Sequence, residues 1–309
     1  MNAEIYHIPA MLRETIDGLN IQPNGVYVDV TFGGGGHSRA ILESNCGHLY
    51  SFDQDIDAML NVQRDNVQGT KGNCFIDNPK WTFVHSNFRY LKNWMDFYGV
   101  EQIDGILADL GVSFHHFDSP ERGFSFRFSA PLDMRMNQTA KRTAADIVNG
   151  YSEEELSKLF YLYGELKNGR QLAHAICQAR SKCPIMRTEE LVAASRISAD
   201  KSKELARLFQ ALRIEVNDEL GALREMLVAA RDLLKPGGRI AVLTYHSLED
   251  RLVKNFLRSG NLEGAIEKDF YGNNLSPFTL IEKGREASAE EVERNPRARS
   301  AKLRIAEKK

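Results

Sequence analysis

Apolar and polar positions in the first third of the chain alternate in blocks. Short apolar runs at 26–30, 48–52, 81–85 and 103–108 have the length and composition of buried strands. Between them, the residues near 37–44, 56–64 and 88–98 show helical patterns. Strands that alternate with helices predict a parallel sheet with right-handed crossovers, and therefore a doubly wound α/β fold.

The alternation of strand and helix patterns stops between about 138 and 204, where only helical patterns occur. Ser152, with Glu155 three residues later, has the pattern of a capping box at a helix start. Another helix is predicted to begin at Thr188. We therefore expect an inserted all-helical domain over 138–204, within a domain that is split into 1–137 and 205–309.

The last third returns to the sheet. A long helix is predicted around 206–234, and a Pro-Gly-Gly turn then leads into an apolar strand at 239–244. Residues 260–277 are rich in glycine and asparagine and are expected to form a loop. An antiparallel hairpin that closes the sheet is expected from two extended segments, 278–282 and 301–306.

Composition narrows the class of protein. The chain has 309 residues, 42% of them apolar, which is enough for a sizeable core. Its net charge of −2 means that any nucleic-acid surface must be local. The four cysteines form no C-x-x-C pair or zinc-type cluster, so we expect reduced thiols, a cytoplasmic protein and no metal site. Neither a membrane-spanning run nor a signal-peptide pattern is present, so no membrane partner is expected.

A glycine-rich turn joins the first strand to the first helix, in the arrangement that cradles nucleotides. Ser38 stands where a dinucleotide fingerprint needs its third glycine. The order Asp-x-x-x-Gly-x-Gly from Asp29 instead resembles the S-adenosylmethionine (SAM) loop of class I methyltransferases. Asp29 is then placed to meet the amino group of SAM, and Asp53, which ends the second strand, to accept bonds from ribose hydroxyls. A glycine turn without a ligand is the alternative.

The fourth predicted strand ends at Asp109, on the edge where open α/β sheets bind ligands. Methylation of an exocyclic base amine needs a hydrogen-bond acceptor there, because the amine lone pair is delocalised into the ring. Amino-methyltransferases follow this acid with two prolines and an aromatic residue. Here both prolines are absent and Val112 takes the aromatic position. We predict that Asp109 orients the amine or lines the SAM pocket; an aspartate that caps the following turn is the alternative.

Two further segments are candidates for the substrate side. Aromatic residues and arginines at 114–118 and 122–126 suit a base held out of its stack, with packing in a core as an equal alternative. The segment 244–251 ends the fifth strand on the same edge and contains His246 and Ser247. Adjacent strand residues point to opposite faces, which disfavours a Ser–His nucleophile. We expect these residues to contact the substrate or the neighbouring loop.

Positive charge gathers in two regions, the C-terminal segment 294–304 and the helical insertion. Local basic patches on a nearly neutral chain suit contacts with phosphates, although a solvated charged face is the alternative. The basic residues of the insertion are Lys141, Arg142, Lys167, Arg170, Arg180, Lys182 and Arg187.

Taken together, the chain resembles the bacterial 16S rRNA (cytosine-N4)-methyltransferase family. The resemblance covers nearly the whole chain, and several of its motifs are peculiar to that family. The matching segments are 27–38, 104–113, 122–126, 131–136, 209–214, 246–251 and 295–300.

This resemblance implies a class I methyltransferase: a Rossmann-like, doubly wound sheet with an inserted all-helical domain for substrate recognition. It implies SAM-dependent N4-methylation of a cytidine in the decoding region of 16S rRNA, with the small ribosomal subunit as partner. His116 takes the place of a glutamine that is usual in the family, and 203–206 replaces a common Pro-Ala-Thr. The implied SAM contacts are Gly35, Gly36, His37, Asp53, Phe88, Asp109 and His116.

Two other functions stay open. A DNA amino-methyltransferase would use the same chemistry at the fourth strand, and competition between ribosomal subunits and duplex DNA separates the two. A non-catalytic SAM-dependent regulator or RNA-binding assembly factor would bind SAM without forming product. A dehydrogenase is disfavoured by Ser38. The sequence leaves the oligomeric state open, a homodimer included.

Overall fold

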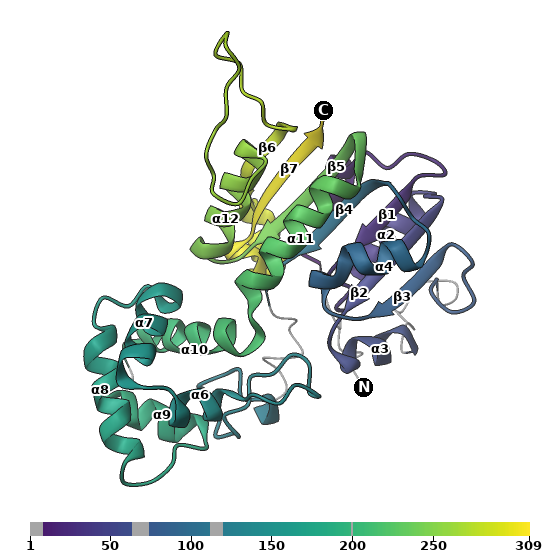
Figure 1. The fold of residues 1–309 in the computed structure, drawn as a ribbon. Helices are drawn as coiled ribbons and strands as arrows, with labels where there is room; N and C mark the ends of the chain where they lie inside the picture. Colours follow the sequence, from purple (N-terminus) through teal and green to yellow (C-terminus); the bar gives the residue numbers. More distant parts are fainter. Residues whose placement is uncertain (1–8, 64–73, 112–119, 199) are drawn as a thin grey trace. The chain divides into compact units, whose positions relative to one another are not determined.

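A computed structural model describes residues 9–63, 74–111, 120–198 and 200–309. The chain packs as two compact units, one formed by 1–111 with 220–309 and the other by 112–219. The first unit contains a seven-stranded sheet, and the second is built from helices (Figure 1). Within the described ranges, no helix has the length and apolar content needed to cross a membrane.

The sheet has the strand order β3-β2-β1-β4-β5-β7-β6. The strands β1 to β5 pair in parallel, whereas β7 pairs antiparallel with both β5 and β6. This order confirms the expected doubly wound α/β sheet closed by an antiparallel pair. The strands are β1 Val26–Asp29, β2 His48–Asp53, β3 Trp81–His85, β4 Ile103–Asp109, β5 Leu234–Thr244, β6 Phe278–Glu286 and β7 Lys302–Lys308.

Helices cover both faces of this sheet. Successive strand residues point to opposite faces, so Ile106 and Ala108 of β4 join one core while Leu107 joins the other. The first core contains residues of α4, α11 and α12, and the second contains residues of α1, α2 and η3. The helices of this unit are α1 Leu12–Leu19, α2 Gly36–Glu43, α3 Ile56–Gln63, η1 Phe88–Tyr90, α4 Leu91–Phe97, α11 Glu219–Leu233, α12 Ser247–Ser259, α13 Ala289–Arg294 and η3 Pro296–Ser300.

The second unit has a separate apolar core. Its predicted capping box is confirmed, because Ser152 Oγ accepts the Glu155 N–H at 3.2 Å and Glu155 Oε2 accepts the Ser152 N–H at 2.7 Å. Leu132 and Leu208 belong to this same core, so segments on both sides of 138–204 pack with the helices and not with the sheet. Within its described residues, the elements are η2 Pro120–Arg122, α6 Ala144–Gly150, α7 Glu153–Gly164, α8 Gly169–Arg180, α9 Thr188–Ser195 and α10 Ser202–Asn217.

The long helix predicted at 206–234 is two helices, α10 and α11, so that prediction is wrong. Asp218 separates them in the left-handed conformation, with a φ of 47°. The side chain of Asn217, at the end of α10, accepts the Met136 N–H and donates to the Met134 carbonyl, both at 2.8 Å. Apolar periodicity continues on both sides of a one-residue break, so the pattern alone does not reveal it.

Candidate functional site

The carboxyl ends of five parallel strands lie side by side along one edge of the sheet (Figure 1). Because the strand order is β3-β2-β1-β4-β5, the segments that follow these strands occupy successive positions along the edge. Most of the expected site residues therefore share one edge, as the parallel sheet predicted. In spatial order these are Phe88, Asp53, the glycine loop, Asp109 and the start of α12.

The glycine loop needs its glycines for two different reasons. Gly33 and Gly35 have φ values of 51° and 78°, which disfavour residues with a side chain. A Cβ added to Gly35 would lie 2.9 Å from Phe32 Cζ, so there is also no room for one. At Gly33, apart from the residue itself and its two chain neighbours, the nearest described atom to such a Cβ is the Thr31 carbonyl oxygen at 4.0 Å. Among the described residues, the Cβ side of Gly33 is therefore open, whereas that of Gly35 packs against protein.

Asp29 is fully buried and holds the shape of this loop. Its Oδ2 accepts the Ser38 hydroxyl at 2.6 Å, and its Oδ1 accepts the Thr31 N–H at 3.0 Å. Burial raises the pKa of Asp29. Ser38 in turn lies 2.8 Å from the Ser51 hydroxyl on β2. These contacts turn the carboxylate inward, so the expectation that Asp29 meets the amino group of SAM is not supported by its surroundings.

Asp53 and Phe88 lie on the β2 and β3 side of the loop. Asp53 is half-buried, and its carboxylate accepts the Gly33 N–H at 2.8 Å and the Asp55 N–H at 2.9 Å. Asp53 therefore connects the end of β2 to the glycine loop. Phe88 begins η1 and packs half-buried against the sheet core. A carboxylate that ends β2 and an aromatic ring that follows the neighbouring β3 suit the ribose and adenine parts of a nucleoside.

Gly36 and His37 lie against the segment that precedes α1. A Cβ on Gly36 would lie 2.8 Å from Pro9 Cγ. The His37 ring is 5% exposed, and its Nε2 lies 3.2 Å from the Ala10 carbonyl oxygen. Burial lowers the pKa of His37, so the ring is neutral at pH 7. His116, the remaining implied SAM contact, lies outside the described residues.

Asp109 forms a polar contact that the sequence did not predict. The Tyr245 hydroxyl, from the end of β5, donates to Asp109 Oδ1 at 2.7 Å. The Asp109 N–H donates to Thr31 Oγ1 at 2.6 Å, and His37 Nδ1 lies 3.6 Å from Asp109 Oδ2. The one available signal was the adjacency of the fourth and fifth strands, which places Asp109 beside the residue that follows Thr244.

The surroundings of Asp109 and Tyr245 shift the pKa of both side chains. Burial raises the pKa of Asp109 to about 7, although the Tyr245 hydrogen bond favours the charged form. Burial and then the nearby Asp109 raise the pKa of Tyr245 well above its usual value, so the phenol stays protonated and acts as a donor. Asp109 is therefore a mostly buried carboxylate that keeps 15% of its side chain exposed and has a pKa raised to about 7.

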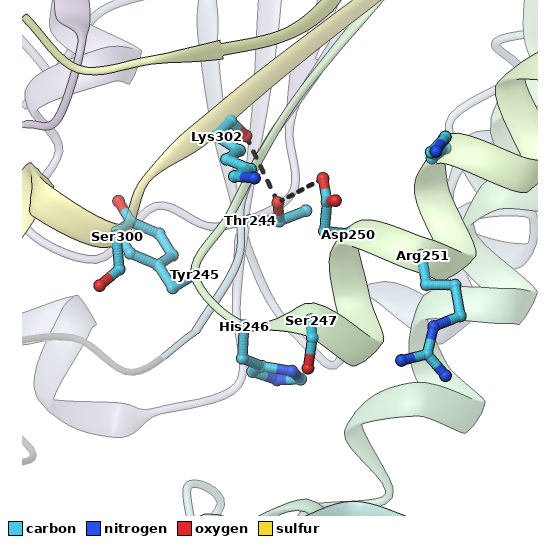
Figure 2. A pocket seen from close by; sticks show the side chains of 9 residues that line it. Thr244, Tyr245, His246, Ser247, Asp250, Arg251, Ser300 and Lys302 are labelled. Carbon is cyan, nitrogen blue, oxygen red and sulfur yellow. Dashed lines mark hydrogen bonds between the residues drawn. The ribbon is translucent and has the colours of Figure 1, made fainter. Parts of the chain in front are cut away.

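A pocket of about 410 Å³ lies at the carboxyl end of β5 (Figure 2). His246 precedes α12, and its Nε2 lies 3.0 Å from Glu249 Oε1 in the first turn of that helix. Thr244 Oγ1 lies 3.4 Å from both Asp250 Oδ1 and the Lys302 carbonyl. The lining residues are Thr244, Tyr245, His246, Ser247, Asp250, Arg251, Lys254, Ser300 and Lys302.

Arg304 on β7 fixes one wall of this pocket. Its guanidinium donates to the two Asp250 oxygens at 2.7 and 3.1 Å. Burial opposes ionisation of Asp250, but the bonds from Arg304 outweigh it and lower the pKa of the carboxyl. Only 10% of the Arg304 side chain and 20% of the Asp250 side chain are exposed, so each depends on the other for charge compensation.

Arg304→Ala is expected to lower the free energy of unfolding by about 3 kcal/mol at pH 7, because it leaves a mostly buried carboxylate unpaired. Urea denaturation measures this, with Arg285→Ala on the exposed side of β6 as the control. The lowered pKa means that the pair stabilises the protein above the ordinary carboxyl pKa and loses this effect as the pH falls. The difference between the two variants should therefore shrink in acid; equal losses at pH 7 would contradict the assignment.

The described part of the aromatic segment packs inside the second unit. Phe124 is buried, and the Phe126 ring lies 5.6 Å from that of Phe209. Arg122 donates to the Arg135 and Met136 carbonyls at 2.9 and 3.1 Å. For these residues the core alternative holds; 114–118 lies outside the described residues.

Comparison with known proteins identifies the family. The model of the MraW methylase family matches residues 4–309. "Ribosomal RNA small subunit methyltransferase H" of Phocaeicola vulgatus is 57% identical over 312 residues, covering 99% of this chain and 98% of the relative. The protein of the same name in Bacteroides thetaiotaomicron is 56% identical over 310 residues, covering 98% of each.

A solved structure described as an rRNA methylase from Streptococcus thermophilus aligns over 98% of both chains, at 13% identity and a TM-score of 0.42. The family match and the curated relatives confirm the expected SAM-dependent methyltransferase. The chain belongs to the MraW methylase family.

Proposed function

We propose that the chain methylates N4 of a cytidine in the decoding region of 16S rRNA, within the small ribosomal subunit. The observation that carries this proposal is the mostly buried Asp109 carboxylate beside the glycine loop, held by Tyr245 and with a pKa raised to about 7. The curated relatives, which carry the name of a small-subunit rRNA methyltransferase, support the choice of substrate.

The residues present fit SAM. The open space beside Gly33 is suited to its methionine part, the half-buried Asp53 to its ribose and Phe88 to its adenine. Gly35, Gly36 and His37 complete the proposed contact set, with His116 beyond the described residues. When bound, SAM supplies an electrophilic methyl group on its sulfonium.

Asp109 is proposed to act on the acceptor amine. The lone pair of a cytosine amine is delocalised into the ring, and an acceptor bonded to an amine proton helps to localise it on nitrogen. An ionised carboxylate offers about four acceptor positions, of which the Tyr245 hydroxyl takes one. A pKa of about 7 also suits Asp109 to receive the amine proton after transfer. The same carboxylate would thereby orient the amine and accept its proton.

The helical unit is proposed to recognise the rRNA. The basic side chains of its insertion that lie exposed include Lys141, Lys167, Arg170 and Lys182. Exposed cations on a chain of net charge −2 favour phosphate contacts confined to part of the surface.

Tyr245→Phe is expected to move the acidic limb of the kcat–pH profile to higher pH. The lost hydrogen bond favours the ionised form of Asp109, so the pKa of Asp109 should rise above about 7. Turnover at pH 7 should fall several-fold and recover toward the wild-type rate at pH 9. Tyr271→Phe, at an exposed tyrosine, is the control. An unchanged acidic limb would show that the Tyr245 hydroxyl does not act on the reacting carboxylate.

Competition between acceptors tests the proposed substrate. Labelled methyl transfer from SAM is measured with unmodified small ribosomal subunits and duplex DNA in one mixture. The proposal expects label in the subunits alone. Label in DNA would favour a DNA amino-methyltransferase, and SAM binding without any labelled product would favour a non-catalytic regulator or assembly factor.

A further inference from the structure

We propose that the pocket at the carboxyl end of β5 is a phosphate subsite, which holds a phosphodiester group of the strand that carries the acceptor cytidine. This inference rests on the proposed function, because it assigns to the pocket the backbone next to the base that Asp109 would orient. The proposed SAM contacts include no residue of the 244–251 segment or of the C-terminal basic segment 294–304. The phosphate subsite gives both segments a role.

The chemistry of the lining suits an anion. Three lining side chains are cationic: Arg251, Lys254 and Lys302. Lys302 pairs with Glu286 at 3.2 Å, but this pair is largely exposed, so a phosphate can replace the carboxylate at little cost. The one lining carboxylate, Asp250, is compensated by Arg304. Among the lining side chains, three are therefore cationic and one is a carboxylate.

The other lining groups include hydroxyls and rings. Among the lining hydroxyls, that of Ser300 is exposed and suited to donate to a phosphate oxygen, whereas the Thr244 hydroxyl is bonded to Asp250 and the Lys302 carbonyl. Among the lining side chains, the Tyr245 ring is the single benzenoid ring, and its hydroxyl is bonded to Asp109. The lining thus combines cations and hydroxyls with two rings, those of Tyr245 and His246.

Three segments far apart in the sequence form the pocket. β5 ends at Thr244, and α12 carries Arg251 and Lys254 along the first two turns that follow. Lys302 is the antiparallel partner of Thr244 in the β5–β7 pairing. The exposed Lys254 and Arg251 thus line the same pocket as Lys302 of the C-terminal basic segment. Figure 2 shows Arg251 and Lys302 among the lining side chains.

The pocket lies next to the reacting carboxylate. Tyr245 lines the pocket, and the same side chain reaches Asp109 with its hydroxyl. One tyrosine side chain therefore connects the two sites. A cytidine whose amine meets Asp109 would have a backbone phosphate within reach of the cations.

Binding of cytidine and of its 5′- and 3′-monophosphates tests the subsite, measured by calorimetry in the presence of S-adenosylhomocysteine. The wild type is expected to bind one of the monophosphates about fivefold more tightly than cytidine, as two partly exposed charge contacts allow. The double variant Arg251→Ala, Lys254→Ala should lose this preference. The double variant Arg258→Ala, Lys283→Ala, which removes two exposed cations outside the lining, should keep it.

A second readout uses small ribosomal subunits over a series of salt concentrations. The pocket variant should lower the slope of log affinity against log salt by about two, one for each lost phosphate contact, and the control variant should leave it unchanged. Equal binding of cytidine and both monophosphates by the wild type would overturn the subsite, as would equal effects of the two double variants.

The two proposals fail in different ways. Labelled N4-methylcytidine in subunits, with no preference for a monophosphate, would keep the proposed function and reject the subsite. A monophosphate preference that the pocket variant abolishes, without methylation of subunits, would keep the phosphate subsite and reject the proposed acceptor.

Discussion

Asp109→Ala is expected to lower kcat for methyl transfer by about 10²–10⁴-fold, the range typical of a positioned proton acceptor. The variant removes the acceptor that orients the amine and takes its proton, while the glycine loop and Asp53 remain to bind SAM. The dissociation constant of SAM should therefore change far less than kcat. Single-turnover methylation of small subunits and calorimetric titration with SAM measure the two quantities separately.

Two further variants sharpen this prediction. Asp109→Asn keeps the shape and one carbonyl acceptor but does not ionise, so its residual activity should not rise through pH 7. Asp104→Asn is the matched control at the other end of β4, where the carboxylate accepts the Val26 N–H and pairs with Lys235. It should reduce stability and leave kcat intact. Wild-type turnover and SAM affinity in Asp109→Ala would refute the role assigned to this residue.

Gly35→Ala is expected to weaken SAM binding by at least about tenfold. A φ of 78° costs a residue with a Cβ about 1–2 kcal/mol, and the new Cβ would meet Phe32 at 2.9 Å and Phe75 at 3.0 Å. Because the Phe32 and Phe75 rings pack on each other and on Trp81, we expect the loop to shift rather than the rings, and Gly33 to move with it. Calorimetric titration with SAM measures the effect directly.

Gly99→Ala is the control variant, because it introduces similar backbone strain without displacing the glycine loop. Gly99 has a similar φ of 69°, but among the described residues nothing lies within 4 Å of its added Cβ, and it precedes β4 at the opposite edge of the sheet. It should lose stability by about 1–2 kcal/mol with SAM affinity unchanged. If both variants bind SAM as the wild type does, the glycine loop is not the cofactor cradle.

The sequence predicted the strands, turns and caps that position the site, because each of these elements depends on residues that are close in sequence. The buried strands, the glycine turn after Asp29 and the Ser152 cap lie where their patterns placed them. The strand ends share one edge because parallel pairing requires it. In the same way, the antiparallel pairing of β6 and β7 follows from two extended segments at the end of the chain.

The remaining features depend on contacts between distant segments. The orientation of Asp29 is set by Ser38 and by burial on the sheet, and the Tyr245 contact by the pairing of β4 with β5. The break at Asp218 is stabilised by Asn217 bonds to a loop about 80 residues earlier. Apolar periodicity carries none of this information, since it records which face is buried and not which polar groups meet.

The most direct test of the proposed function identifies the methylated nucleoside. The protein is incubated with radiolabelled SAM and small ribosomal subunits from a strain lacking this gene, and the rRNA is then digested and its labelled nucleosides separated. The proposal predicts a single labelled species, N4-methylcytidine, from one site in the decoding region. Label in any other nucleoside, or no label despite measured SAM binding, would contradict it.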